Sequence, residues 1–391
     1  QSYQKNNSIS IGTQSGNTGQ LDNSIALGTQ SGEISQGPQA IAIGYNAGQN
    51  YQNTESIAIG YYAGNSTQGQ SAIAIGGQAG FFSQGFYTVA LGSFAGQNNQ
   101  GWRSTAVGYG AGNSNQNYFS TAIGMNAGNS GQGTNATAVG HAAAETSQGN
   151  HSVAIGYAAA NSNQGYQAVA IGRRAGWQYQ NDYSVAVGPY AGQQHQNWYS
   201  VAMGYQAGNY YQGAGSVAIG DNAGYNYQSD DGIAIGTNAG YNTNNSNGWA
   251  PIAIGRYAGA EYSGHQSIAL GSYAGNSNLG YRAIAIGHYA GWEGTGQYAV
   301  AIGDGAGDLS GEGTISIGTE SGYRANNYSV AIGYNAGKTN QGTASVAIGS
   351  GSEVKFDDVA TVTVTASRTR NPIDVSSTES NTVFSLSEIQ A

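Results

Sequence analysis

Small and β-branched residues alternate in a short phrase that returns along most of this chain. It reads Ser-Val-Ala-Ile-Gly at 152–156 and Ala-Val-Ala-Ile-Gly at 168–172. A β-branched residue stands three residues and one residue before the final glycine, with Ala between them. An alternation with a period of two that ends at glycine predicts a short β-strand rather than a helix.

The final glycine of this phrase recurs every 16 residues from Gly12 to Gly236. One step of 19 residues then leads to Gly255, which indicates an insertion near residues 244–249, and later steps of 15 or 16 residues end at Gly349. The series contains 22 phrases. A fixed period of this length is typical of solenoids, in which each repeat forms one coil. We therefore predict an all-β parallel β-solenoid, or β-roll, of 22 coils with about 16 residues each.

Two further markers accompany the phrase in each repeat, counted here from its final glycine as position 0. Ala-Gly usually follows at positions +3 and +4, and Gln stands at position +8 in 14 consecutive repeats. Glutamines stacked at the inter-strand spacing can hydrogen-bond along a ladder. The predicted structural ladder includes Gln52, Gln68, Gln84, Gln100, Gln116, Gln132, Gln148 and Gln164.

The small residue at position −2 raises the question of what lies against it. We expect the Ile/Val face of the strand to point into the coil, so that Ala lies on the opposite face against another chain, with three chains as the preferred number. The alternative is a single solenoid whose narrow coil requires small residues on both sides. The predicted inter-chain face includes Ala58, Ala74, Ala90, Ala154, Ala170 and Ala218.

Composition narrows the functional classes. The chain has 65 Gly among 391 residues, no Cys, and only 11 Lys and Arg, so we expect no nucleic-acid partner. It has no apolar run long enough to span a membrane. Five scattered His and few carboxylates predict no metal site, no cofactor and no catalytic residues, hence no enzyme. One stretch, Gly303–Asp308 (GDGAGD), faintly resembles a calcium-binding turn but occurs once.

Aromatic residues in the variable turns are the candidates for ligand or partner contact. Exposed Trp and Tyr beside Asn and Gln can stack on sugar rings or anchor a receptor. Alternatively, they form a ladder that covers Gly-rich backbone or packs between chains. The candidates are Trp102, Trp177, Trp198, Trp292, Tyr118 and Tyr166.

The repeated phrase resembles that of a known family. Ser152–Gly156, Ser184–Gly188, Ser216–Gly220 and Ser345–Gly349 are similar to the head repeats of YadA-like trimeric autotransporter adhesins. Residues 331–349 (AIGYNAGKTNQGTASVAIG) also resemble AIG repeats of marine phage tail-fibre proteins. The first resemblance implies a left-handed roll with three chains per head, although its period of about 14 residues is shorter.

These observations favour a structural fibre or adhesin shaft, a rigid rod on an extracellular, cell or virion surface that mediates projection and attachment. A carbohydrate-binding module that uses the Tyr/Trp turns is the alternative. An ice-binding solenoid ranks lower, because position −4 mixes Ser, Ala, Thr, Gly and Pro. We place the repeat rod at residues 1–350 and expect residues 351–391 to form a non-repeat cap or transition segment.

Overall fold

The chain is a parallel β-solenoid of about 21 turns with about 16 residues per turn, as the prediction required. The computed structural model describes residues 4–242, 250–339, 341–352 and 362–364. Every regular element in this part of the chain is a three-residue β-strand. The predicted insertion near 244–249 lies outside the described residues. The chain divides into two units, residues 1–200 and 201–391.

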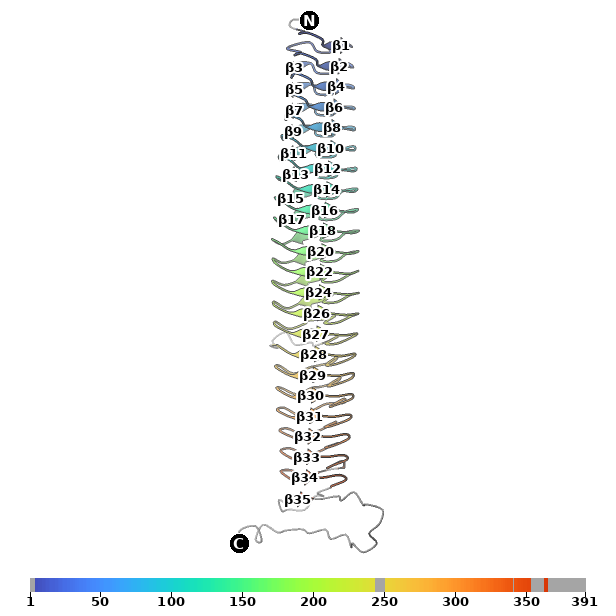
Figure 1. The fold of residues 1–391 in the computed structure, drawn as a ribbon, viewed down its shortest axis with the longest axis vertical. Coiled ribbons are helices and arrows are strands. Elements are labelled where there is room, and N and C mark those ends of the chain that lie inside the picture. The colour runs from blue at the N-terminus through green and yellow to red at the C-terminus, as the bar shows by residue number, and fades with distance from the viewer. Residues whose placement is uncertain (1–3, 243–249, 340, 353–361, 365–391) are drawn as a thin grey trace, which may run out of the picture. The chain divides into compact units, whose positions relative to one another are not determined.

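The first unit carries two ladders of parallel strands, which appear as two columns of labels in Figure 1. The first ladder uses the repeated phrase, and equivalent residues lie opposite each other, such as Ala154 and Ala170. Its strands are β1 (Ile9–Ile11), β2 (Ile25–Leu27), β4 (Ile41–Ile43), β6 (Ile57–Ile59), β8 (Ile73–Ile75), β10 (Val89–Leu91), β12 (Thr105–Val107), β14 (Thr121–Ile123), β16 (Thr137–Val139), β18 (Val153–Ile155), β20 (Val169–Ile171) and β22 (Val185–Val187).

The second ladder of this unit ends each strand on the repeated Gln at position +8. Its strands are β3 (Ile34–Gln36), β5 (Asn50–Gln52), β7 (Ser66–Gln68), β9 (Phe82–Gln84), β11 (Asn98–Gln100), β13 (Ser114–Gln116), β15 (Ser130–Gln132), β17 (Thr146–Gln148), β19 (Ser162–Gln164), β21 (Gln178–Gln180) and β23 (Gln194–Gln196).

The second unit keeps the first ladder, while the opposite side of the coil is held mainly by isolated bridges such as Asn226 to Asn242. Its strands are β24 (Val201–Met203), β25 (Tyr210–Gln212), β26 (Val217–Ile219), β27 (Ile233–Ile235), β28 (Ile252–Ile254), β29 (Ile268–Leu270), β30 (Ile284–Ile286), β31 (Val300–Ile302), β32 (Ile315–Ile317), β33 (Val330–Ile332), β34 (Val346–Ile348) and β35 (Val362–Val364).

Changes in repeat length leave the strand register intact. Ile233 lies opposite Ile252 across the long step, and Val300 lies opposite Ile315 across a short one. The strand register therefore holds on both sides of the long step and of the short one. Strand β35 pairs with β34, Val362 lying opposite Val346, so one strand of the segment expected to be non-repeat continues the ladder.

The two faces of the phrase point the opposite way from our expectation. Ala154 is fully buried inside the coil of a single chain, whereas Ile155 is 39% exposed. The same burial corrects the whole predicted inter-chain face, since Ala58, Ala74, Ala90, Ala154, Ala170 and Ala218 all have no exposed surface. The coil interior explains the inversion, because other side chains already fill it and leave no room for two β-branched residues per turn.

Glutamine from position +8 is the largest side chain inside most coils. The side-chain nitrogen Nε2 of Gln68 donates to the carbonyl oxygen of Ile57, at 2.7 Å, and to that of Ala72, at 3.1 Å. The amide thus crosses the coil and ties the second ladder to the first. Ser at position −4 is also buried and satisfied, as when Ser56 donates to the carbonyl of Asn53 at 2.6 Å. The core therefore combines many small Ala side chains with Gln and Ser side chains that donate hydrogen bonds, in place of large aliphatic residues.

Glycine at position 0 meets two separate requirements. Gly156 has φ of 130°, a conformation that side chains of L-residues rarely adopt, and a Cβ there would lie 2.7 Å from the carbonyl oxygen of Gly172. Close stacking of coil on coil therefore excludes any side chain at this bend.

Candidate binding surfaces

The described coils present an apolar strip on the outer face of the first ladder. Leu91, Ile123 and Ile155 at position −1 are 43%, 41% and 39% exposed. Because the register places Ile155 opposite Ile171, positions −3 and −1 form two adjacent columns of mostly aliphatic side chains within each unit, with Thr105, Thr121 and Thr137 at position −3 of three consecutive coils. A continuous exposed apolar surface of this kind marks an interaction site.

The predicted glutamine ladder lies inside the coil. Beyond its bonds to the strand carbonyls, the Nε2 of Gln148 donates to the Oε1 of Gln164, and the Nε2 of Gln164 donates to the Oε1 of Gln180, both at 3.2 Å. Similar bonds join Gln84 to Gln100 and Gln116 to Gln132. All eight predicted ladder residues, Gln52, Gln68, Gln84, Gln100, Gln116, Gln132, Gln148 and Gln164, are buried.

Three aromatic residues at position +10 (equally −6 from the next glycine) form an exposed column in the first unit. The ring of Trp102 lies 5.4 Å from that of Phe86 and 5.8 Å from that of Tyr118, between centroids. These rings line a shallow cavity of about 480 Å³ together with Asn99 and Asn117. Trp102 also covers backbone, since a Cβ on Gly85 would lie 2.8 Å from its ring. The column therefore has both a structural role and an exposed surface.

The other predicted aromatic residues are not gathered at one site. Trp198 is exposed, whereas Trp177 is half-buried beneath the guanidinium of Arg174, 5.2 Å from its ring. Tyr166 is half-buried, edge-on to Tyr183. Trp292 lines a different cavity in the second unit.

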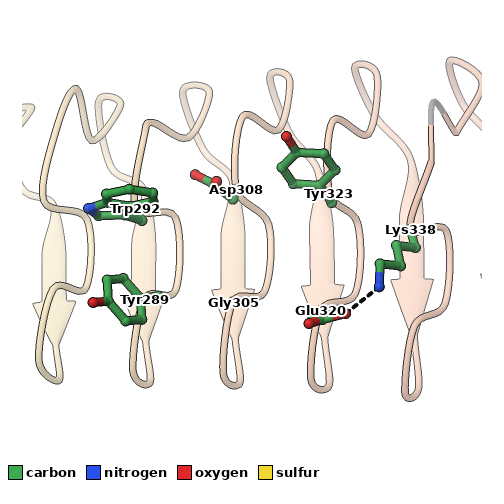
Figure 2. Close-up of a pocket in the computed structure, with 7 residues that line it drawn as sticks. All are labelled: Tyr289, Trp292, Gly305, Asp308, Glu320, Tyr323 and Lys338. Atoms are coloured by element: carbon green, nitrogen blue, oxygen red, sulfur yellow. Dashed lines mark hydrogen bonds and ion pairs between the residues drawn. The ribbon is translucent and has the colours of Figure 1, made fainter.

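That cavity has a volume of about 290 Å³ and mixed chemistry. Figure 2 shows Tyr289 and Trp292 on one coil, Asp308 on the next, and Glu320 and Tyr323 on the coil after it. Lys338 closes the far side and forms an ion pair with Glu320. The lining residues are Tyr289, Trp292, Gly305, Asp308, Glu320, Tyr323 and Lys338.

The carboxylates of this cavity differ in environment. Burial raises the pKa of Asp308, although its Oδ1 accepts the backbone N–H of Glu293 at 2.6 Å. The hydrogen bond to Glu320 raises the pKa of the Lys338 ammonium. The lining contains the carboxylates of Asp308 and Glu320 but only one ammonium group, that of Lys338. Its formal net charge is therefore negative, which favours a cationic ligand.

Sequence reasoning named Trp292 and the Gly303–Asp308 stretch separately, and missed Tyr289, Glu320, Tyr323 and Lys338. One feature of the sequence could have indicated this cavity. Gly305 stands at position +2, and the three preceding coils carry a tyrosine at that position, Tyr257, Tyr273 and Tyr289. The structure gives no support for a calcium site at Gly303–Asp308, because the described residues contain no group of three or more potential metal ligands. Asp304 instead lies 3.1 Å from His288.

Serines at position −4, the face that an ice-binding array would need, are buried, as Ser104 and Ser152 show. The described segments also contain no helix with the length and hydropathy needed to cross a bilayer.

A short part of the chain is similar to a known protein family. Residues 132–159 match the YadA head domain repeat, in two copies. No curated protein sequence matches the chain. The match runs from the end of β15 to the turn after β18, and Gln132, Gln148 and Ala154 within it are all buried in the coil. It supports the first of the two predicted resemblances, and the likeness to phage tail-fibre repeats stays a prediction.

Proposed function

We propose that this chain is a structural segment of an extracellular, adhesin-like fibre in which three copies pack their Ile/Val faces together. The observation that supports it most is the apolar strip formed by positions −3 and −1. Burying such a strip is worth roughly 25 cal/mol for each Å² of apolar surface, and repetition over many coils makes the gain large. The core of Ala, Ser, Gly and Gln contains few large apolar side chains, so burial of the strip adds apolar contacts that the coil interior lacks.

The number of chains rests on family likeness. YadA-type heads are trimeric adhesins, and residues 132–159 match their repeat. Cyclic symmetry lets three identical strips meet around one axis and leaves no strip exposed. The second ladder then faces outward, with its variable Asn, Thr and aromatic side chains available for attachment to a surface or receptor.

The test is the oligomeric state of the purified chain, measured by light scattering and native mass spectrometry. We expect a trimer for the wild type. The triple variant Leu91→Glu, Ile123→Glu, Ile155→Glu places a charge on alternate coils of the strip between residues 91 and 155 and should weaken the assembly.

A matched control adds three charges to the opposite side of the same unit. Thr67→Asp, Asn115→Asp, Asn163→Asp alters exposed residues of the second ladder and should leave the trimer intact. Wild-type monomers at micromolar concentration, or equal dissociation of both variants, would rule out assembly through the Ile/Val face.

A second candidate role, glycan attachment, is favoured by the exposed column of Phe86, Trp102 and Tyr118. We expect Trp102→Ala to lose glycan binding on an array while the trimer survives. Trp177→Phe, at a half-buried ring, is the matched control. A wild type that binds no glycan on the array would contradict this role and leave the fibre proposal standing.

A further inference from the structure

A missing ring in a column of stacked tyrosines creates the cavity of Figure 2. The ring of Tyr257 stacks on Tyr273 at 5.1 Å and 7°, and Tyr273 stacks on Tyr289 at 4.9 Å and 11°. The next coil carries Gly305 at the same position, so no further ring continues the parallel stack beyond Tyr289. Glu320 occupies this position one coil further on. His288 and Trp292 of the same coil as Tyr289 contact its ring at steep interplanar angles, 65° and 76°.

The backbone shows that these residues are consecutive rungs of one column. The N–H of Gly305 donates to the carbonyl of His288, and that of Glu320 donates to the carbonyl of Asp304, in the same coil-to-coil pattern that joins Tyr289 to Ser272. Coils are about 4.8 Å apart. The gap between Tyr289 and Glu320 therefore has the thickness of one planar group stacked on the tyrosine face.

We propose that this slot binds a planar guanidinium cation, the group of an arginine side chain. Tyr289 offers a ring face, Trp292 and Tyr323 form aromatic walls, and Asp308 and Glu320 supply carboxylates that a guanidinium can reach with fixed, paired N–H groups. The bound cation would replace the absent ring and complete the column.

A guanidinium of the chain itself already lies beside two stacked rings of the same column. The guanidinium carbon of Arg256 lies 5.6 Å from the Tyr257 ring centroid and 5.0 Å from that of Tyr273. Arg256 also donates to the Tyr273 hydroxyl at 2.7 Å. A guanidinium held by stacked tyrosines is thus a geometry that these coils accommodate. At Gly305 the carboxylates are added and no arginine lines the cavity; the nearby Arg324 lies over the Tyr323 ring, 5.1 Å from its centroid.

Binding is measured by isothermal titration and tryptophan fluorescence with two probes of the same shape, acetyl-arginine methylamide and acetyl-citrulline methylamide. Citrulline keeps the planar end group without its charge. We expect a millimolar dissociation constant for the arginine probe, binding at least about tenfold weaker for the citrulline probe, and weakening by salt. Equal affinity for both probes, or no binding of either, would overturn the proposal.

Gly305→Tyr restores the missing ring and should abolish binding. The change is compatible with the fold, since Tyr273 and Tyr289 have φ of 59° and 53° against 63° for Gly305, and a Cβ there meets only the Glu320 Cγ at 3.7 Å. Ala142→Tyr adds the same ring at the same coil position in the first unit, where the existing residue has φ of 54°, and should not affect binding. Unchanged affinity in a folded Gly305→Tyr variant would overturn the site.

A second pair of variants separates charge from shape. Asp308→Asn keeps an oxygen that can accept the Glu293 N–H but removes a cavity charge, and should weaken arginine binding about tenfold. Asp304→Asn removes a carboxylate that does not line the cavity and should leave affinity within about twofold. Equal effects of the two variants would show that general electrostatics alone attracts the probe and would contradict a built site.

Discussion

Gln116 hydrogen-bonds directly to Gln132 in the next coil, with 3.1 Å between Nε2 and Oε1, and the same Nε2 lies 2.8 Å from the carbonyl oxygen of Thr105. One amide therefore links neighbouring coils to each other and also links the two sides of its own coil. This dual bond explains why a polar residue recurs at a fully buried position.

The first prediction concerns this amide. Gln164 uses its Nε2 to donate to Val153, Ala168 and Gln180. Gln164→Glu removes these donors and buries a carboxylate against carbonyl oxygens, which should cost about 3 kcal/mol or more. Gln164→Leu should cost only about 1 to 2 kcal/mol, because Leu279 occupies the same coil position in the second unit, 2% exposed. Denaturant unfolding followed by circular dichroism compares them, and equal losses would contradict the hydrogen-bonding role.

The second prediction separates the two glycine positions of each coil. Gly156→Ala should destabilise strongly, by about 3 kcal/mol or more, because its Cβ would meet the Gly172 carbonyl in the next coil. Ala160→Gly should be neutral or stabilising by up to about 1 kcal/mol, since Ala160 already has φ of 45°. Thermal melts of both variants measure the difference. Similar melting temperatures would show that coil stacking is looser than described.

The third prediction compares two adjacent residues of strand β18. Ala154→Glu puts a charge into the closed interior of the coil and should unfold the surrounding turns. Ile155→Glu puts the same charge on the exposed strip and should leave the fold of one chain intact while it weakens association. Circular dichroism reports folding and native mass spectrometry reports assembly. Loss of assembly by a fully folded Ala154→Glu variant would restore the interpretation that Ala faces another chain.

The fourth prediction is a pH dependence at Asp308. Burial raises the pKa of this carboxyl above its ordinary value of 3.8, so the folded chain binds the proton more tightly than the unfolded chain does. Its contribution to stability is therefore present below the ordinary pKa and is lost as pH rises through the raised folded value. The Asp308→Asn variant has no carboxyl group at this position and so does not lose this stability as pH rises. Its free energy of unfolding relative to that of the wild type should therefore increase between about pH 3 and pH 6. Denaturant midpoints over that range measure the change, with Asp304→Asn as the control, and a flat difference would contradict it.

The repeat period and the turns could be predicted from sequence because both depend on local chemistry. Three-residue strands end one residue before each glycine, as in Val153–Ile155 before Gly156, because alternating β-branched residues favour a strand and only glycine adopts the bend that follows. The Gln ladder was predictable for a related reason, since one residue type at a constant spacing must stack when coils are parallel.

Sequence alone determined the period, the strand positions and the stacking of like residues, since a 16-residue repeat with glycine bends leaves few other parallel arrangements. Only the tertiary structure decided which face of the phrase is inside. Alternation shows that Ala154 and Ile155 point in opposite directions but not which one is buried, and that choice depends on the space left by Gln164 and Ser152 within the same coil. The slot beside Gly305 is a tertiary property for the same reason: it exists only because residues 15 or 16 apart lie in one column, where a missing ring exposes Tyr289.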